Sequence, residues 1–180
     1  MKPKLSIGVC SVITLALVFF GLIYGTLTGF DDERRQVTDM LAGDKGLMEV
    51  LRYRSADGLN LCVVARRHLD GDPDIRALEA AAKNLRDSKE SLSNIKREDD
   101  HLTEAAERVA KKLQGSSSFL ADHRDQEYLG MLLARLGVLA EDQAIDKYNK
   151  AAADFNAMLD TQTGGALARL LGMKPCELFR

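Results

Sequence analysis

The sequence predicts an all-α protein, in which an N-terminal transmembrane helix is followed by an up-down four-helix bundle with long helices. Residues 5–30 contain no charged side chain, and a run of this length is typical of a membrane span. Beyond it, no segment shows the alternation of apolar and polar residues that predicts a strand. Proline is absent between Asp74 and Lys174, so no proline forces a helix in that interval to break.

These observations divide the chain into four parts. Residues 1–4 form a cytoplasmic tail, 5–30 a transmembrane anchor, 31–172 a helical bundle domain and 173–180 a C-terminal tail. The anchor run is longer than the apolar region of a secretory signal, which has about 7–15 residues, and no Ala-x-Ala cleavage site follows it. We therefore expect an uncleaved signal anchor rather than a cleaved signal peptide.

The charges that flank the anchor predict its orientation. Lys2 and Lys4 precede the anchor, and basic residues favour the cytoplasmic side of a membrane. Arg34 and Arg35 follow it closely, so the difference between the two sides is small. We therefore expect a single-pass membrane protein with its bundle on the extracytoplasmic side.

Three glycines in the anchor, Gly21, Gly25 and Gly29, are spaced four residues apart and therefore share one face of a helix. Small residues at this spacing permit close contact between membrane helices. The spacing is thus compatible with a helix–helix contact in the membrane and with a homo-oligomer. The alternative is that the glycines make no specific contact, since glycine is common in membrane helices.

The first two bundle helices are the longest. The first is expected over residues 31–69, continuous with the anchor, and the sequence AGDKG is its weakest point. The second begins with Asp72 as N-cap and Pro73 as the first helical residue. Apolar residues then recur at steps of three and four as far as Leu113, which predicts one unbroken helix.

Two shorter helices complete the expected bundle. The sequence QGSSSF separates the second helix from a third over residues 119–136, and a fourth follows over residues 138–161. Gly164 and Gly165 end the fourth helix, and a short amphipathic turn covers residues 166–171. Helices joined by short connections are typical of up-down bundles.

The sequence lacks the patterns of common catalytic and metal sites. His68, His101 and His123 include no pair at the i, i+4 spacing of a helical metal site, and HExxH and CxxC motifs are absent. The Gly-x-Ser-x-Gly motif is absent as well. We expect no enzyme activity, no cofactor and no metal. The net charge of −2, without a basic tract, also argues against binding of nucleic acid.

Two cysteines, Cys62 and Cys176, lie outside the anchor. In an oxidising compartment they could form a disulfide. The alternative is two free thiols, because the sequence alone does not bring the two residues within bonding distance.

Two aromatic–asparagine pairs, Tyr148-Asn149 and Phe155-Asn156, stand seven residues apart in the expected fourth helix. At that spacing the two rings lie on one stripe of the helix, and the two asparagines lie on a second stripe. We expect the rings to enter the core and the asparagines to sit at its edge, bonded to a neighbouring helix. The alternative is that the pairs form a ligand site.

The pairs belong to a longer pattern that includes Leu159, Ala166, Ala168, Gly172-Met173 and Phe179. Together with the sequence RSADGLNL at Arg54–Leu61 and the N-terminal anchor, this pattern resembles the LemA family of membrane-anchored bacterial proteins. The chain would be a divergent member, because Gln162 and Thr163 stand where the family has Phe-Pro. The resemblance implies a four-helix bundle on a membrane anchor, and it implies no catalytic residues.

The sequence therefore favours a structural or interaction function. We expect a membrane-anchored scaffold or adaptor of the cell envelope that binds a protein partner, whose identity the sequence does not reveal. The alternative is an extracytoplasmic sensor bundle that binds a small ligand and signals through a membrane partner.

Overall fold

The computed structural model describes residues 7–180, and every regular element in that range is an α-helix, which confirms the all-α prediction. The expected cytoplasmic tail, residues 1–4, and the first two residues of the expected anchor lie outside the described residues. The helices in chain order are α1 (Ile7–Ala42), α2 (Leu47–His68), α3 (Pro73–Asp87), α4 (Leu92–Gln114), α5 (Ser117–Leu120), α6 (His123–Ala140), α7 (Gln143–Thr161) and α8 (Gly165–Leu170).

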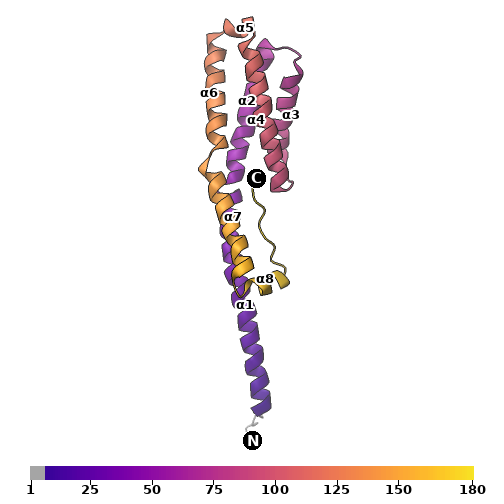
Figure 1. The fold of residues 1–180 in the computed structure, drawn as a ribbon, viewed down its shortest axis with the longest axis vertical. Helices are drawn as coiled ribbons and strands as arrows, with labels where there is room; N and C mark the ends of the chain where they lie inside the picture. The colour runs from indigo at the N-terminus through magenta and orange to yellow at the C-terminus, as the bar shows by residue number, and fades with distance from the viewer. Residues whose placement is uncertain (1–6) are drawn as a thin grey trace.

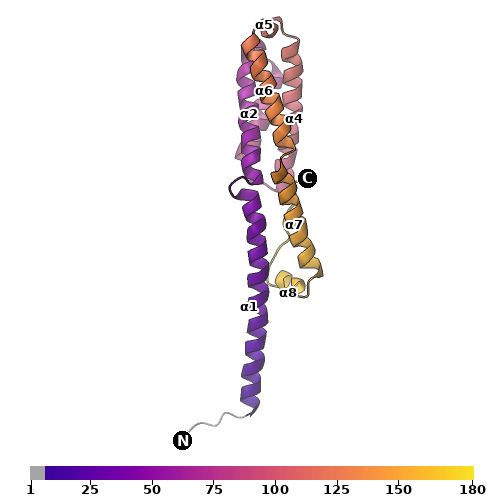
Figure 2. The same cartoon turned by 90° about the vertical axis from the view of Figure 1, so that its left-hand side faces the viewer.

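The helices form an elongated structure with two levels (Figure 1 and Figure 2). At the upper level α2, α3, α4 and α6 pack together, and the short α5 connects the tops of α4 and α6. At the lower level α7 and α8 pack against α1, whose N-terminal part extends alone beneath them. The C-terminal tail, residues 173–180, runs back up from α8 toward the lower end of α4.

The expected unbroken helix from Pro73 to Leu113 is wrong, because the chain reverses at residues 88–91 and continues as α4. The helices α3 and α4 pack against each other in opposite directions, so the apolar stripe expected along one helix is folded onto itself. Lys89, which a straight helix would place in the apolar seam, is exposed in the turn. The buried apolar residues of the hairpin include Ile75, Leu78, Leu85, Leu92, Ile95 and Leu102.

The helix expected over residues 31–69 is also interrupted, since α1 ends at Ala42 and α2 begins at Leu47. Lys45 adopts a φ of 58°, a conformation that does not continue a helix. Its backbone N–H donates to the carboxylate of Glu49 at 2.7 Å, which satisfies one donor at the start of α2. The interruption falls within the AGDKG sequence.

The third and fourth expected helices, residues 119–136 and 138–161, differ from the structure at their boundaries. After α5, α6 continues through the expected joint as far as Ala140. Asp142 then accepts a hydrogen bond from the N–H of Ala144 at 2.8 Å and caps the start of α7. The capping residue Asp142 therefore marks the boundary between the two helices. Gly137, where the boundary was expected, lies inside α6.

Two adjacent glycines let the chain turn from α7 into α8. A Cβ added at Gly165 would lie 2.3 Å from the carbonyl oxygen of Leu159, so a larger residue does not fit there. A Cβ added at Gly164 would lie 3.2 Å from Cγ2 of Thr26 and 3.3 Å from Cε2 of Phe30. The start of α8 is therefore packed closely against α1.

Candidate functional site

The aromatic rings of the two pairs on α7 lie in the core, as we expected. Tyr148 and Phe155 are each 2% exposed. The ring of Phe155 meets that of Phe30 on α1 edge-on, with 6.5 Å between their centroids. Burial raises the pKa of Tyr148 to about 12, so its phenol stays protonated at neutral pH. The Tyr148 hydroxyl donates to the carbonyl oxygen of Glu177 in the C-terminal tail at 2.6 Å.

The two asparagines hold the backbone of the C-terminal tail. The side-chain amide of Asn149 donates to the carbonyl of Phe179 at 3.0 Å and accepts from the N–H of the same residue at 2.8 Å. Asn156 makes the same pair of bonds with Cys176, at 2.9 Å and 2.7 Å. The expected bond to a neighbouring helix is therefore wrong, because the partner of both side chains is the extended tail.

The spacing of the two asparagines matches the tail that they hold. Seven residues of helix advance by about 10.5 Å, and the three steps from Cys176 to Phe179 cover about 9–10 Å of extended chain. Both amides can therefore reach backbone groups of one straight segment. Because they bond only to N–H and C=O groups, they recognise the path of the tail rather than its side chains.

The tail also connects α7 to α4. The carboxylate of Glu177 accepts a hydrogen bond from the backbone N–H of Leu92 at 2.7 Å, at the start of α4. A negative charge at this position satisfies a free donor and suits the positive end of the helix. Phe179 is 2% exposed, and the ammonium group of Lys96 lies 5.9 Å from its ring centroid. The tail therefore joins the two levels of the structure.

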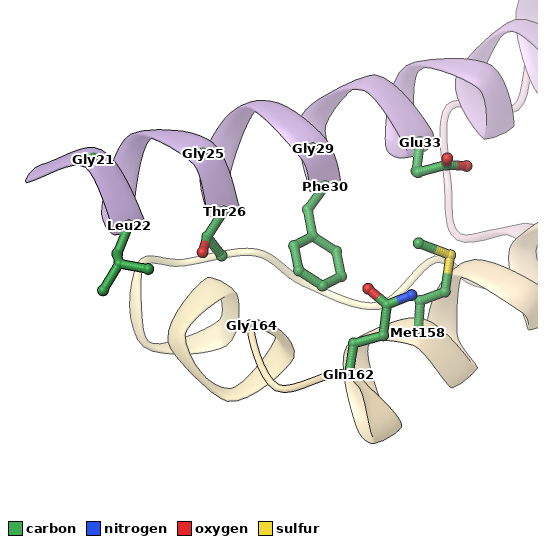
Figure 3. Close-up of a pocket in the computed structure, with 10 residues that line it drawn as sticks. All are labelled: Gly21, Leu22, Gly25, Thr26, Gly29, Phe30, Glu33, Met158, Gln162 and Gly164. Carbon is green, nitrogen blue, oxygen red and sulfur yellow. The ribbon is translucent and has the colours of Figure 1, made fainter. Parts of the chain in front are cut away.

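A groove of about 460 Å³ lies between α1 and the α7–α8 turn (Figure 3). Leu22, Thr26 and Phe30 point from α1 toward the opposite wall, which Met158 and Gln162 contribute. The groove adjoins a segment of α1 that is long and apolar enough to cross a membrane by length and composition, and none of that segment is buried within the chain.

The three anchor glycines, Gly21, Gly25 and Gly29, border this groove, but no other segment of residues 7–180 packs closely against them. A Cβ added at any of the three would meet no atom within 4 Å among the described residues. Their contact with a second membrane helix therefore stays a prediction.

A buried ion pair, which the sequence analysis missed, connects three helices. Arg54 on α2 is 1% exposed, and its Nε lies 2.5 Å from Oδ1 of Asp99 on α4. The same guanidinium donates to the hydroxyl of Thr103 at 2.7 Å and to the carbonyl of Leu136 on α6 at 2.5 Å. Burial raises the pKa of Asp99, and the charge of Arg54 opposes this effect. The only signal in the sequence was Asp99 itself, a charged residue at a position where the apolar period of residues 75–113 requires an apolar one.

Two neighbours of Arg54 also make polar contacts in the core. The hydroxyl of Ser55 donates to the carbonyl of Ala82 on α3 at 2.7 Å. Asp57 is 1% exposed, and its Oδ2 lies 3.2 Å from Nε of Arg135 on α6 without the geometry of a hydrogen bond. Burial raises the pKa of Asp57, and Arg135 opposes the shift. The segment RSADGLNL therefore contacts three other helices.

A second polar cluster lies near the upper end, where α2 and α6 meet. Asp125 lies 2.7 Å from Nη1 of Arg67 and 2.9 Å from Nε2 of His68. Burial opposes ionisation of Asp125, but its contacts with His68 and Arg67 outweigh burial and lower the pKa of the carboxyl. Ligand atoms of Asp125, His68 and Asp122 lie within 4.8 Å of one another. The guanidinium of Arg67 supplies the positive charge there, so the arrangement favours an ion pair over a metal site.

Cys62 and Cys176, for which the sequence left a disulfide and two free thiols open, are free thiols in the structure. Cys62 is buried on α2, with its sulfur 3.8 Å from the carbonyl oxygen of Ile75 on α3. Cys176 lies in the tail, where Asn156 holds its backbone. The two cysteines thus lie in different surroundings, and no disulfide joins them in the structure.

No protein-family model, curated protein or solved structure matches the chain. The resemblance to the LemA family therefore stays a prediction from the sequence, and the functional argument rests on the geometry of the chain itself.

Proposed function

We propose that this chain is a single-pass membrane protein whose helical domain acts as a scaffold or protein-interaction adaptor at the bacterial cell envelope. One observation carries the proposal. The N-terminal part of α1 exposes a continuous apolar surface, for instance at Leu15, Leu17 and Phe20, which are 67–71% exposed. A helix in the core of a soluble protein would bury such residues, whereas a bilayer would cover them.

The anchor and the domain share one uninterrupted helix. The helix α1 continues from the apolar part to Ala42, and Phe30 and Val37 in its second half are buried. The domain is therefore fixed to the end of the anchor by packed side chains rather than by a flexible linker. This rigid connection would hold a binding surface of the domain at a fixed distance from the membrane, as a scaffold requires.

An exposed apolar surface between α2 and α6 supports the adaptor role. Tyr53 is 48% exposed and Val138 is 71% exposed, and both line an open groove of about 330 Å³ with Leu139. Aromatic and aliphatic side chains of this kind, beside Arg135, are typical of the centre of a protein–protein contact. The identity of the protein partner is open to experiment.

The proposal includes the orientation of the chain in the membrane and its resemblance to the LemA family. Lys2 and Lys4 favour a cytoplasmic N-terminus, which would place the domain on the periplasmic side of the inner membrane. The aromatic–asparagine pairs that resemble the LemA family hold the tail of this chain. The resemblance thus rests on residues with a packing role.

A ligand-sensing bundle is the second candidate function. An open groove of about 690 Å³ lies between α1, the α3–α4 turn and the tail, with Arg34, Lys89 and Lys174 among its lining residues. Glu90 and Glu177 also line this groove, and its size would accommodate a small polar molecule. A sensor would bind such a molecule in this groove and pass the change to a membrane partner through α1.

Two charge substitutions test the anchor. Arginine at Leu17, in the exposed apolar part of α1, would cost about 2.5–3.5 kcal/mol of insertion free energy. Leu17→Arg should therefore release the full-length chain from membranes washed with carbonate. Leu120→Arg, at a site 59% exposed in α5, is the matched control and should leave the chain in the membrane fraction. Release of both variants by carbonate would contradict the membrane anchor.

Site-specific photocrosslinking in the native membrane tests the adaptor. A photoreactive residue at Val138 should capture one defined envelope protein, whereas the same residue at Glu104, exposed on α4, should not. Capture of this chain alone from both positions would argue against an adaptor. Protease treatment of spheroplasts checks the orientation, because a domain that is protected there cannot lie outside the cytoplasm.

A further inference from the structure

The height of the membrane surface can be placed along α1, given the proposed anchor. The twenty residues from Ile7 to Thr26 advance by about 30 Å, which is the thickness of the hydrocarbon core of a bilayer. Asp31, Asp32 and Glu33 follow soon afterwards. The surface on the domain side therefore falls near Thr26 and Phe30.

The short helix α8 lies at this height. A Cβ added at Gly164, the residue that precedes α8, would lie 3.2 Å from Thr26 and 3.3 Å from Phe30. Figure 3 shows Thr26 and Phe30 pointing toward Gly164 across the groove. In both views of the fold, α8 is at the lower end of the packed domain, and only α1 continues below it (Figure 1 and Figure 2).

One side of α8 is packed, and the other exposes leucines. Ala168 is fully buried, with 0% exposure, whereas Leu170 is 83% exposed and Leu171, in the following turn, is 41% exposed. Single exposed leucines are ordinary on a protein surface. Two adjacent ones at the expected height of the bilayer are not explained by packing within the chain.

Basic residues flank these leucines. Arg169 lies between Ala168 and Leu170 and is about half exposed, and Lys174 is exposed three positions after Leu171. Arg169 also forms an ion pair with Asp160 on α7. Apolar side chains that are flanked by basic ones are typical of segments that lie in the interfacial layer of a membrane.

We propose that α8 and the turn that follows it form a second membrane contact, in which Leu170 and Leu171 enter the interfacial layer of the phospholipid bilayer. The occupant of this surface is lipid, because α8 packs beside the anchor segment of α1 at the expected height of the bilayer surface. Two contacts, the span and α8, would limit the tilt of the elongated domain relative to the membrane.

The chain contains no tryptophan, so a single introduced tryptophan reports on one position by fluorescence. Leu170→Trp is placed in the full-length chain, which is reconstituted in vesicles of zwitterionic and anionic phospholipid. The fluorescence emission of this tryptophan should lie at shorter wavelength in vesicles than in the same chain unfolded in urea without detergent. Lipids brominated near the headgroup should quench it more strongly than lipids brominated at the chain ends, because interfacial residues lie about 5–10 Å deep.

Two further variants separate this inference from the anchor on which it rests. Leu17→Trp lies in the apolar part of α1 and should be quenched most by deeply placed bromine. Leu120→Trp, at a site that is 59% exposed at the far end of the domain, should not be quenched by either lipid.

Quenching of Leu17→Trp without quenching of Leu170→Trp would overturn the α8 contact and leave the anchor standing. Absence of quenching at both positions would overturn the anchor as well. A blue-shifted Leu170→Trp that brominated lipid does not quench would indicate a protein cover, either a second copy or a partner, and would also overturn the lipid contact. Leu171→Trp repeats the measurement at the neighbouring position.

Discussion

The side-chain amide of Asn149 pairs with both backbone groups of Phe179, accepting from its N–H at 2.8 Å and donating to its carbonyl at 3.0 Å. An amide carries one acceptor and one donor group at the spacing that a neighbouring strand would offer. Side-chain amides on a helix therefore supply the hydrogen bonds that the backbone of a neighbouring strand would supply to the extended tail in a sheet. This relationship explains why an asparagine follows an aromatic residue, since the ring enters the core while the amide turns to the tail.

Replacement of either asparagine should loosen the tail. Asn149→Ala or Asn156→Ala leaves an N–H and a C=O of the tail without their partner, at a cost of about 1–3 kcal/mol of unfolding free energy. Hydrogen exchange at the amides of Phe179 and Cys176 should become faster. Asn60→Ala, at an exposed position on α2, is the control and should change the unfolding free energy by less than about 0.5 kcal/mol. Unchanged exchange in the first two variants would show that the tail is held by other contacts.

Replacing one member of the buried Arg54–Asp99 pair should lower the free energy of unfolding by more than replacing both members. Arg54→Met leaves the Asp99 carboxylate buried without its partner, which costs about 3–5 kcal/mol. The double variant Arg54→Met/Asp99→Leu removes the unpaired charge and should be more stable than the sum of the two single changes predicts. Urea unfolding in detergent measures the cycle, with exposed Arg52→Met as the control. Additive effects would show that the two side chains are not coupled.

Local signals predicted the helical content and the start of α3 well. The N-cap Asp72 accepts from the N–H of Asp74 at 2.8 Å, as its place before Pro73 indicated. The turn at residues 88–91 could not be predicted in the same way. The apolar residues recur with a helical period in both α3 and α4. They would do so in one long helix and in a helical hairpin alike, so the period does not distinguish the two. Lys89, at a position where the apolar period requires an apolar residue, and a one-residue slip of that period between Leu92 and Ile95 were the signs of an irregular helix.

Contacts between distant parts of the chain account for most of what the sequence did not predict. Arg54 and Asp99 are 45 residues apart, and Asn149 and Phe179 are 30 residues apart. The spacing of the asparagines indicated that they share a face, but not that the tail would lie on it. A helical pattern defines which side chains point in one direction, whereas the partner depends on how the helices are arranged.

Cys62 should be nearly unreactive in the folded protein. Burial raises the pKa of its thiol to about 11, so little of the reactive thiolate is present at neutral pH. The thiol of Cys176 is less buried, although burial raises its pKa too, and it should be alkylated faster than Cys62. Peptide mapping after iodoacetamide treatment of protein isolated without reductant measures both rates. A peptide that links the two cysteines would show that they form a disulfide in the cell.

Lys112 on α4 should make stability depend on pH through Asp72 and Asp74 at the start of α3. Its ammonium group lies 2.8 Å from Asp72 and 2.7 Å from Asp74. The hydrogen bonds from Lys112 lower the pKa of both carboxyls below their usual values. A carboxyl whose pKa is lower in the folded state stabilises that state above its unfolded pKa, and this contribution is lost as pH falls through the folded pKa.

Lys112→Met should therefore be less stable than the unmodified chain at pH 7, and the difference should narrow below about pH 4, where the carboxyls become protonated. Urea unfolding at a series of pH values tests this. Lys111→Met, at the adjacent exposed position, controls for the loss of one positive charge. A difference that stays constant from pH 7 to about pH 2.5 would exclude the two carboxyls as its source.

Gly58 allows α2 to approach α4 closely, and alanine there should destabilise the protein although alanine favours helix. A Cβ added at Gly58 would lie 2.6 Å from Cδ1 of Leu102, a side chain with 0% exposure. Overpacking of this kind costs about 1–3 kcal/mol, whereas the gain in helix propensity is about 1 kcal/mol. The expected net effect on the unfolding free energy of Gly58→Ala is a loss of up to about 2 kcal/mol.

Gly130, inside α6, is the matched control, because a Cβ added there meets no atom within 4 Å. Gly130→Ala should raise the unfolding free energy by about 0.5–1 kcal/mol. Leu102→Val, which shortens the opposing side chain, should cost less in the Gly58→Ala background than in the unmodified chain, since it removes the overlap. Stabilisation by both glycine substitutions, or equal costs of Leu102→Val in the two backgrounds, would show that the helices can separate to admit a methyl group.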